Sequence, residues 1–308
     1  MVTPLSFKQR QAQEKPSDKV RVVLIQGSPR AADNCPGQEP KSAKLVKQLS
    51  QDKDFKHVDL DVLDLAVRDK HVQPCKSCVS TAAPLCCWPC NCYSPNDKEY
   101  PDLMHDEDVY SRLQNAHGFM VVTPIHWYGP SSVVKAMFDR LVCCNGGNQS
   151  PDLIDGKDPE KARALEKSPL WEDIKRNHLA GKYAAFFIMG DNGANEGQPN
   201  GVPKLLHDER IFSAAKEAHF NDPKHAVMPI VWQMRYSGVW VKDDCIGGLH
   251  FGEGSPYADN IKNFRDSKQP YEKVKSVLKK LIGYIEADRV NIECSTCKPH
   301  KGHAYPMR

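Results

Sequence analysis

Apolar runs alternate with segments of helical spacing along the first part of the chain. Residues 20–25 are apolar apart from Arg21 and lead into Gln26-Gly-Ser-Pro-Arg30, which predicts a strand buried on both faces and followed by a turn. The next segment starts at Ser42, a residue type that caps helices, and its apolar residues recur three and four positions apart. We therefore expect a strand, a loop and a helix in that order.

The same order of elements recurs further along. Alternation over residues 57–63 predicts an outer strand, and residues 103–115 can form a short helix. A second buried strand is expected at 118–123, followed by a helix that Pro130 opens. A third buried strand is expected at 183–189.

The remaining segments carry weaker patterns. The polar stretch 145–180 is interpreted as an excursion with a helix around 159–166. Residues 206–218 are expected to be helical, and 226–234 to form the last strand. Apolar residues spaced over 274–285 predict a closing amphipathic helix.

Strands that alternate with helices pair in parallel through right-handed crossovers, so the pattern predicts a three-layer, open α/β sheet. Ligands of such sheets bind at the carboxyl ends of the strands, beside the point where the strand order reverses. The loops that deserve most interest are therefore 26–42, 124–130 and 190–197.

Composition narrows the choice of function. The 42 Lys and Arg against 39 Asp and Glu give a net charge of +3, too small to indicate a nucleic-acid or membrane partner. The first 19 residues carry no apolar export signal, and no stretch is long and apolar enough to span a membrane. We expect a soluble, cytoplasmic protein that acts on small molecules.

The first loop has the composition of a phosphate site. Gly27, Ser28, Arg30 and Ser42 offer hydroxyls, a cation and the amides of a helix N-terminus. The loop lacks both the dinucleotide pattern G-x-G-x-x-G and the P-loop pattern. An ordinary solvated loop with one helix cap is the alternative.

The second loop, Thr123-Pro-Ile-His-Trp-Tyr-Gly-Pro130, is rich in aromatic residues. Trp127 and Tyr128 would stand at the carboxyl end of a strand and offer a flat apolar wall to a planar heterocycle. The alternative is that both rings pack under a neighbouring loop.

Taken in order, the three loops resemble those of the NAD(P)H-dependent FMN reductase family of flavodoxin-like proteins. The resemblance covers residues 20–142 well and continues more loosely to about 194, with 118–141 as its most specific part. It implies a flavodoxin-like, three-layer sandwich with a five-stranded parallel sheet in the order 2-1-3-4-5.

By this resemblance, the phosphate of FMN would be held by Ser28, Arg30 and Ser42. The isoalloxazine would be lined by Pro124, Ile125, His126, Trp127, Tyr128 and Gly129, and closed over by Asp191 and Gly193. His126 would either face the flavin or hydrogen-bond backbone.

The function implied by the resemblance is hydride transfer from NAD(P)H to FMN and on to a quinone, another small acceptor or an internal iron–sulfur centre. Because the cofactor carries the chemistry, no catalytic side chain is named. An electron-transfer flavoprotein that serves protein partners and a zinc-stabilised interaction protein are the alternatives. Relatives suggest a homodimer or homotetramer.

Six of the twelve cysteines lie in an insertion at 74–98, between the second strand and the next helix. Clustered thiols in a reducing compartment more often serve metal or redox chemistry than structural disulfides. In the similar iron–sulfur flavoproteins, four cysteines at this place bind a [4Fe–4S] cluster. The expected ligands here are Cys75, Cys78, Cys87 and Cys90, with Cys86 and Cys92 as alternatives for the second pair. Zinc and unliganded thiols are the other interpretations.

The chain is expected to divide into a polar arm at 1–19, a flavodoxin-like domain at 20–288 and a tail at 289–308. The tail region contains Cys294, Cys297, His300 and His303, a zinc-like set that is equally well explained as an incidental group of polar residues.

Overall fold

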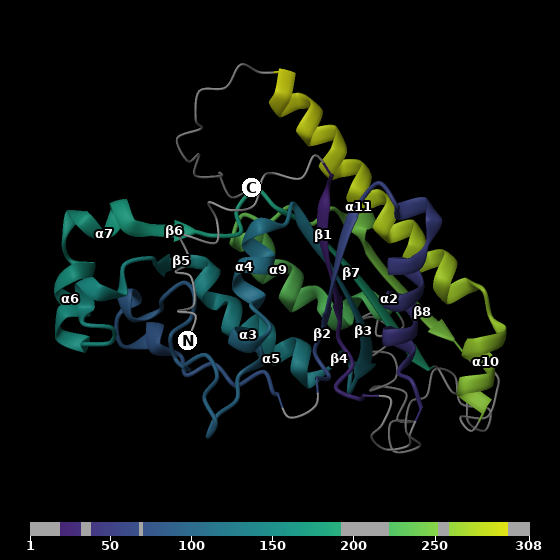
Figure 1. Ribbon diagram of the computed structural model, residues 1–308, viewed down its shortest axis with the longest axis horizontal. Helices are drawn as coiled ribbons and strands as arrows, with labels where there is room; N and C mark the ends of the chain where they lie inside the picture. The colour runs from purple at the N-terminus through teal and green to yellow at the C-terminus, as the bar shows by residue number, and fades with distance from the viewer. Residues whose placement is uncertain (1–18, 32–37, 68–69, 192–221, 252–258, 295–308) are drawn as a thin grey trace, which may run out of the picture.

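The computed structural model describes residues 19–31, 38–67, 70–191, 222–251 and 259–294. Figure 1 shows a central sheet, helices on both of its faces and a smaller unit that projects to the left. The strands of the main parallel sheet are β1 (Arg21–Gln26), β2 (Asp59–Asp64), β3 (Gly118–His126), β7 (Tyr183–Asp191) and β8 (Ile246–Phe251). They lie in the order β2-β1-β3-β7-β8. The predicted flavodoxin-like order 2-1-3-4-5 is confirmed.

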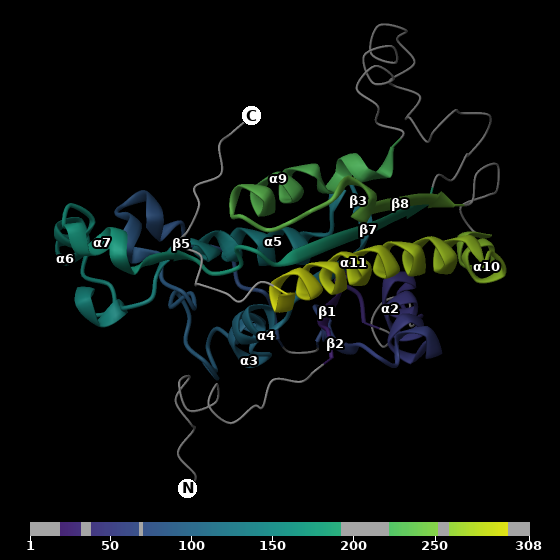
Figure 2. The same cartoon turned by 90° about the horizontal axis from the view of Figure 1, so that it is seen from above.

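Helices cover both faces of this sheet (Figure 2). One face packs against α2 (Lys41–Gln51) and α11 (Gln269–Cys294). The opposite face packs against α4 (Val109–Asn115), α5 (Ser132–Arg140) and α9 (Met228–Tyr236). The other helices are α3 (Leu103–Asp106), α6 (Pro159–Glu166), α7 (Pro169–Ile174) and α10 (Asn260–Asp266).

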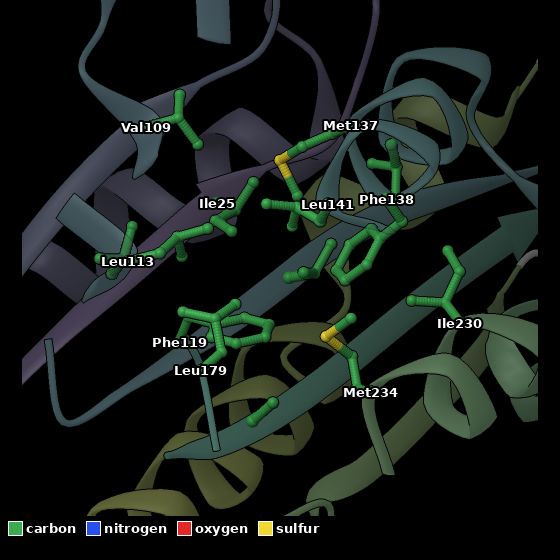
Figure 3. Close-up of a cluster of buried hydrophobic side chains, with 14 of the residues drawn as sticks. Ile25, Val109, Leu113, Phe119, Met137, Phe138, Leu141, Leu179, Ile230 and Met234 are labelled. Carbon is green, nitrogen blue, oxygen red and sulfur yellow. The ribbon is translucent and has the colours of Figure 1, made fainter. Parts of the chain in front are cut away.

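Neighbouring residues of β1 contribute to two different cores. Val22 and Leu24 belong to the core beneath α2 and α11, whereas Val23 and Ile25 belong to the core beneath α4, α5 and α9. All four side chains are fully buried. Figure 3 shows part of the second core, where Ile25 lies among the side chains of the neighbouring helices. Burial of both faces is the reason that this strand is an almost continuous apolar run.

The prediction of a strand at 226–234 is wrong. Residues Met228–Tyr236 form α9, with Pro229 in its first turn, and the last strand of the sheet is β8. A short apolar run fits a buried strand and a buried helix equally well, so spacing could not decide between them. The predicted helix at 206–218 lies outside the described residues.

The excursion at 145–180 forms a small unit together with the cysteine segment. The helix expected around 159–166 is α6, and two short strands, β5 (Asn145–Asn148) and β6 (Lys175–Asn177), pair in an antiparallel manner. A separate core joins the two segments and consists of Ala82, Leu85, Cys87, Ile154, Ala162, Leu165 and Trp171. We call this part of the molecule, residues 75–98 and 145–177, the projecting unit.

A buried ion pair ties the start of the cysteine segment to α5. The Arg140 guanidinium donates to both carboxylate oxygens of Asp102, at 3.1 and 2.9 Å, and to the Tyr110 hydroxyl at 3.1 Å. It also donates to the backbone oxygen of Gln73 at 3.2 Å. Because Arg140 and Asp102 are almost completely buried, these bonds satisfy charges that would otherwise be costly.

Candidate functional site

The backbone turn after β1 lies directly against β3 and α5. The Gly27 N–H donates to the Val122 oxygen at 2.8 Å. A Cβ at Gly27 would stand 2.5 Å from Val134 Cγ2 and 2.9 Å from Thr123 Cβ, which real contacts do not allow. Ser131, the N-cap of α5, donates its hydroxyl to the Gly27 oxygen. Glycine is therefore required for the first loop to lie this close to the second.

Gln26 organises the first loop, although nothing in the sequence analysis singled it out. Its side-chain nitrogen donates to Asp64 Oδ1 at 3.0 Å. Its side-chain oxygen accepts from the Ser28 N–H and, at 3.2 Å, from the Ser42 hydroxyl. The signal that could have revealed it is a polar residue at the end of an apolar strand.

A cavity of about 290 Å³ opens at the carboxyl ends of β1 and β3. The polar side of its lining includes Ser28, Arg30, Lys41 and Ser42, and the opposite side includes Pro124, Ile125, His126, Met189 and Gly190. The structure thus brings together six of the predicted flavin-site residues. Lys41, Met189 and Gly190 were not predicted.

Ser42 is not the helix cap that the sequence suggested. Pro40 occupies the N-cap position, and Ser42 lies inside the first turn of α2 with its hydroxyl directed to Gln26. Proline fits there because its fixed backbone angle suits the start of a helix. Among the described residues, no side chain caps α2 and its first turn holds no acidic residue. The first N–H groups of this helix can therefore bind an anion.

Two cations flank this helix end. Arg30 is half-buried, and its backbone N–H donates to the Ser28 hydroxyl at 3.2 Å. Lys41 is held by a hydrogen bond from its ammonium to Asn260 Oδ1 at 2.9 Å. A helix N-terminus, the Ser28 hydroxyl and two cations are the donors that a phosphate group needs, since the Ser42 hydroxyl gives its one proton to Gln26.

The aromatic loop is a tight hairpin between β3 and β4 (Gly129–Pro130). Ile125 pairs with Pro130 and His126 with Gly129, so Trp127 and Tyr128 are the two turn residues. Both have positive φ angles, 47° and 64°, as the central residues of the tightest hairpin turns do. Asparagine and glycine normally occupy such positions, because other side chains are strained there.

The two aromatic side chains face outward. Trp127 is 94 % exposed and Tyr128 is 57 % exposed, so neither ring is packed under a described loop. His126 is also exposed at the surface, but partial desolvation of its imidazole lowers its pKa. The lowered pKa favours the neutral imidazole, and His126 is one of the residues that line the cavity.

The third predicted loop is described only at its start. Asp191 is the last residue of β7, with its backbone paired to Phe251, and Gly193 lies outside the described residues. Gly190 lines the cavity, and a Cβ there would lie 3.1 Å from Ile125 Cδ1. The close approach of β7 to the second loop is what positions this end of the site.

These features fit FMN. The open helix end with its two cations suits the phosphate, and the neighbouring Pro124, Ile125 and Met189 suit a planar, largely apolar ring. The predicted ring contacts Trp127, Tyr128 and Gly129 do not line this cavity.

The six cysteines of residues 75–92 gather in the projecting unit, beyond the far end of α5. The Cys78 and Cys92 sulfurs are 3.2 Å apart, and the Lys157 ammonium lies 3.4 and 3.1 Å from them. Cys90 also hydrogen-bonds Cys92, which lowers the pKa of the Cys92 thiol. The buried Cys87 thiol is instead directed to the backbone oxygens of Pro84 and Leu85, at 3.8 and 3.7 Å.

The expected ligand set of Cys75, Cys78, Cys87 and Cys90 stays a prediction. In the part of the chain that the structure describes, no group of three or more Cys, His, Asp or Glu side chains is arranged to hold a metal ion. Burial raises the pKa of Cys86 to about 12 and that of Cys87 to about 11. Cys297, His300 and His303 lie outside the described residues, and the Cys294 side chain is not described.

A doubly wound sheet with a phosphate cradle and a ring wall at its switch point defines a flavodoxin-like, flavin-binding protein. The sequence profile of the NADPH-dependent FMN reductases matches residues 20–199, more than half of the chain, so the chain belongs to that family of flavin-dependent NAD(P)H oxidoreductases. No curated protein sequence matches it.

Several solved structures match this chain at low sequence identity, with TM-scores below 0.5. RosB is 9 % identical with a TM-score of 0.44, and the match covers 93 % of this chain and 92 % of RosB. The NAD(P)H:quinone oxidoreductase from Methanothermobacter marburgensis is 12 % identical with a TM-score of 0.40, covering 92 % and 100 %. The NADH:FMN oxidoreductase EMOB is 13 % identical with a TM-score of 0.34, covering 89 % and 90 %.

One further property concerns membranes. None of the helices in the described segments is both long enough and apolar enough to cross a bilayer.

Proposed function

We propose that this protein binds FMN at the cavity between the first and second loops and uses NAD(P)H to reduce a quinone or another small acceptor. The observation that carries the proposal is the uncapped N-terminus of α2 beside Arg30 and Lys41, in one cavity with Pro124, Ile125 and His126. When bound, FMN accepts hydride from nicotinamide and returns electrons to the acceptor.

In this proposal, the side chains of the protein bind FMN and orient its ring. The Ser28, Arg30 and Lys41 side chains and the Ser42 backbone N–H hold the phosphate, while Gln26 fixes the two serines through hydrogen bonds to the Ser28 N–H and the Ser42 hydroxyl. By the resemblance, Pro124 to Gly129 line one side of the ring, and Asp191 and Gly193 are further contacts to it. The neutral His126 imidazole can exchange one hydrogen bond with the ring edge without introducing charge.

Replacement of one cation tests the phosphate site. Arg30→Gln removes the guanidinium and is expected to weaken FMN binding at least tenfold, about 1.4 kcal/mol. Arg163→Gln removes an exposed guanidinium from α6 and is the matched control, with unchanged FMN affinity. Titration of apoprotein with FMN, followed by flavin fluorescence, measures both. Equal affinities in the two variants would contradict the assignment.

Rapid mixing of the FMN-loaded protein with NADPH, and separately with NADH, tests the reaction. Prompt loss of the yellow flavin absorption, and its return on addition of a quinone, is expected. If FMN binds but neither nicotinamide bleaches it, the protein is an electron-transfer flavoprotein that serves protein partners.

We further propose that a second copy of the chain covers the aromatic hairpin, giving a homodimer or homotetramer. An indole that is 94 % exposed on a strained turn supports a contact with another surface. Light scattering of wild type and of Trp127→Ser measures the oligomeric state. Equal masses for the two proteins would show that Trp127 does not contribute to a contact between subunits.

The expected iron–sulfur centre or zinc ion is not part of this proposal. The Lys157 ammonium contacts the Cys78 and Cys92 sulfurs, so both thiols already have a charged partner. Within one copy, α5 also separates the thiols from the flavin loops: Ser131 begins this nine-residue helix at the cavity end, and the cysteine segment pairs with Asn148 beyond its other end.

A further inference from the structure

Three groups from separate segments meet at the surface of the projecting unit. Cys78 starts a 3-10 turn (Cys78–Ser80), Cys92 ends the cysteine run, and Lys157 precedes α6. The Cys92 sulfur lies 3.2 Å from the Cys78 sulfur and 3.1 Å from the Lys157 ammonium, which is 3.4 Å from Cys78. None of these contacts belongs to the flavin site.

Exposure separates this pair from most other cysteines. Cys78 and Cys92 are partly exposed, whereas Cys87, Cys90, Cys143, Cys144 and Cys245 are buried. Lys157 is exposed. A small molecule in solution can therefore reach the pair without any rearrangement of the core.

We propose that Cys78 and Cys92 form a redox-active dithiol that exchanges with low-molecular-weight disulfides, with Cys92 as the attacking thiol and Cys78 as the resolving thiol. Cys92 takes the first role because it is the closer of the two to the Lys157 ammonium. A cation at this distance stabilises negative charge on sulfur, and the thiolate is the nucleophile in exchange.

The exchange proceeds in two balanced steps. The Cys92 thiolate attacks one sulfur of the external disulfide RSSR, whose S–S bond breaks to form a mixed disulfide and release RS⁻. The Cys78 thiolate then attacks the Cys92 sulfur and releases the second RS⁻. The two protons given up by the cysteines end on the two RSH molecules, so the protein is oxidised by two electrons and RSSR is reduced by two.

The geometry favours the second step. The two sulfurs need to approach from 3.2 Å to the disulfide bond length, a movement of about 1.2 Å. Formation of the disulfide also removes the negative charge on sulfur that attracts the Lys157 ammonium. The contact between the cysteine segment and the start of α6 is therefore expected to loosen on oxidation.

The proposal is tested on the full-length protein, purified without oxygen and incubated with oxidised glutathione, with peptide mapping by mass spectrometry. Wild type is expected to form the Cys78–Cys92 disulfide and to retain no glutathione. Cys78→Ser is expected to trap glutathione on Cys92. Cys92→Ser is expected to lose the rapid reaction, and Lys157→Met to slow it at least fivefold.

Matched controls separate the pair from general thiol reactivity. Cys75→Ser removes another partly exposed thiol, and Lys161→Met removes an ammonium that pairs with Asp155 on the surface. Both are expected to react at the wild-type rate. Unchanged thermal unfolding midpoints establish that each variant is folded, and FMN binding is expected to be the same in all of them.

Three results would overturn the proposal. The first is stoichiometric iron or zinc in the purified protein that must be removed before Cys78 and Cys92 react. The second is a Cys90–Cys92 disulfide in place of Cys78–Cys92. The third is a wild-type rate in Cys92→Ser.

Discussion

At the scale of single residues, the first loop depends on a position where no side chain fits. A Cβ at Gly27 would meet Val134 and Thr123, which belong to the helix and the strand that carry the second loop. Gly27→Ala is expected to lower the free energy of unfolding by about 1 to 3 kcal/mol and to weaken FMN binding, because the two loops are pushed apart. Urea unfolding and FMN titration measure the two effects.

Gly283 provides the matched control for this substitution. It lies within α11 and nothing stands within 4 Å of a Cβ added there. Gly283→Ala is therefore expected to stabilise the protein by up to about 1 kcal/mol, because alanine favours helices. If both variants behave alike, the crowding around Gly27 has no energetic consequence.

Lys182 makes stability depend on pH. Burial lowers the pKa of its ammonium to about 8, although the group donates to the Ala116 oxygen at 2.6 Å. Below pH 8 both folded and unfolded chains carry the proton, so the full cost of the buried charge is present. Between pH 8 and about 10.5 only the unfolded chain keeps the proton, so stability rises with pH.

Lys182→Met is therefore expected to stabilise the protein by roughly 1 to 3 kcal/mol at pH 7. The difference from wild type should shrink above pH 8 and vanish near pH 10.5. Urea unfolding at a series of pH values measures it. A difference that does not change with pH would mean that Lys182 acts through packing alone.

At the scale of elements, the β3–β4 hairpin places two aromatic residues where the backbone disfavours them. A positive φ costs about 1 to 2 kcal/mol at a residue with a side chain. The hairpin keeps this strain at Trp127 and Tyr128, whose rings stand outward beside the cavity. Strain of this kind is typical of positions that serve binding.

Replacement of the turn separates stability from binding. The double variant Trp127→Asn with Tyr128→Gly supplies the residues that such a turn prefers. It is expected to raise the free energy of unfolding by about 1 to 2 kcal/mol and to weaken FMN binding or turnover with NADPH. A variant that is less stable than wild type, with unchanged affinity and turnover, would contradict this interpretation of the hairpin.

At the scale of the whole molecule, the projecting unit has a core of its own, separate from the two cores of the sheet. Trp171 is the largest side chain in that core and is 6 % exposed. Trp171→Ala is expected to open the unit locally, because loss of a buried indole leaves a cavity and lowers the stability by about 3 to 5 kcal/mol. FMN binding is expected to persist, since the flavin loops lie at the opposite end of α5.

Hydrogen exchange measured by mass spectrometry distinguishes local from global opening. Faster exchange confined to residues 75–98 and 145–177, with β1 and β3 still protected, is the expected result. Equal acceleration in β1 and β3 would show that the unit and the sheet unfold together.

Some parts of this structure could be predicted from the sequence, and others could not. The strands β1, β3 and β7 were predictable because each is buried on both faces over most of its length and is therefore an almost continuous apolar run. Ser28, Arg30 and the aromatic hairpin were predictable because they follow those strands directly, and strand ends of a parallel sheet converge on one edge.

Other features depended on contacts between distant segments. Most of residues 226–234 became part of α9 (Met228–Tyr236), because an apolar run this short takes the form that its neighbours can bury. Gln26 became the organiser of the first loop through bonds to Asp64 and Ser42, which no spacing reveals. Cys92, rather than Cys87, became the partner of Cys78 because the core of the projecting unit buries Cys87 and leaves Cys92 beside Lys157. Local apolar pattern thus determined the sheet and the order of its loops, whereas side-chain partners were decided only when folding brought separate segments together.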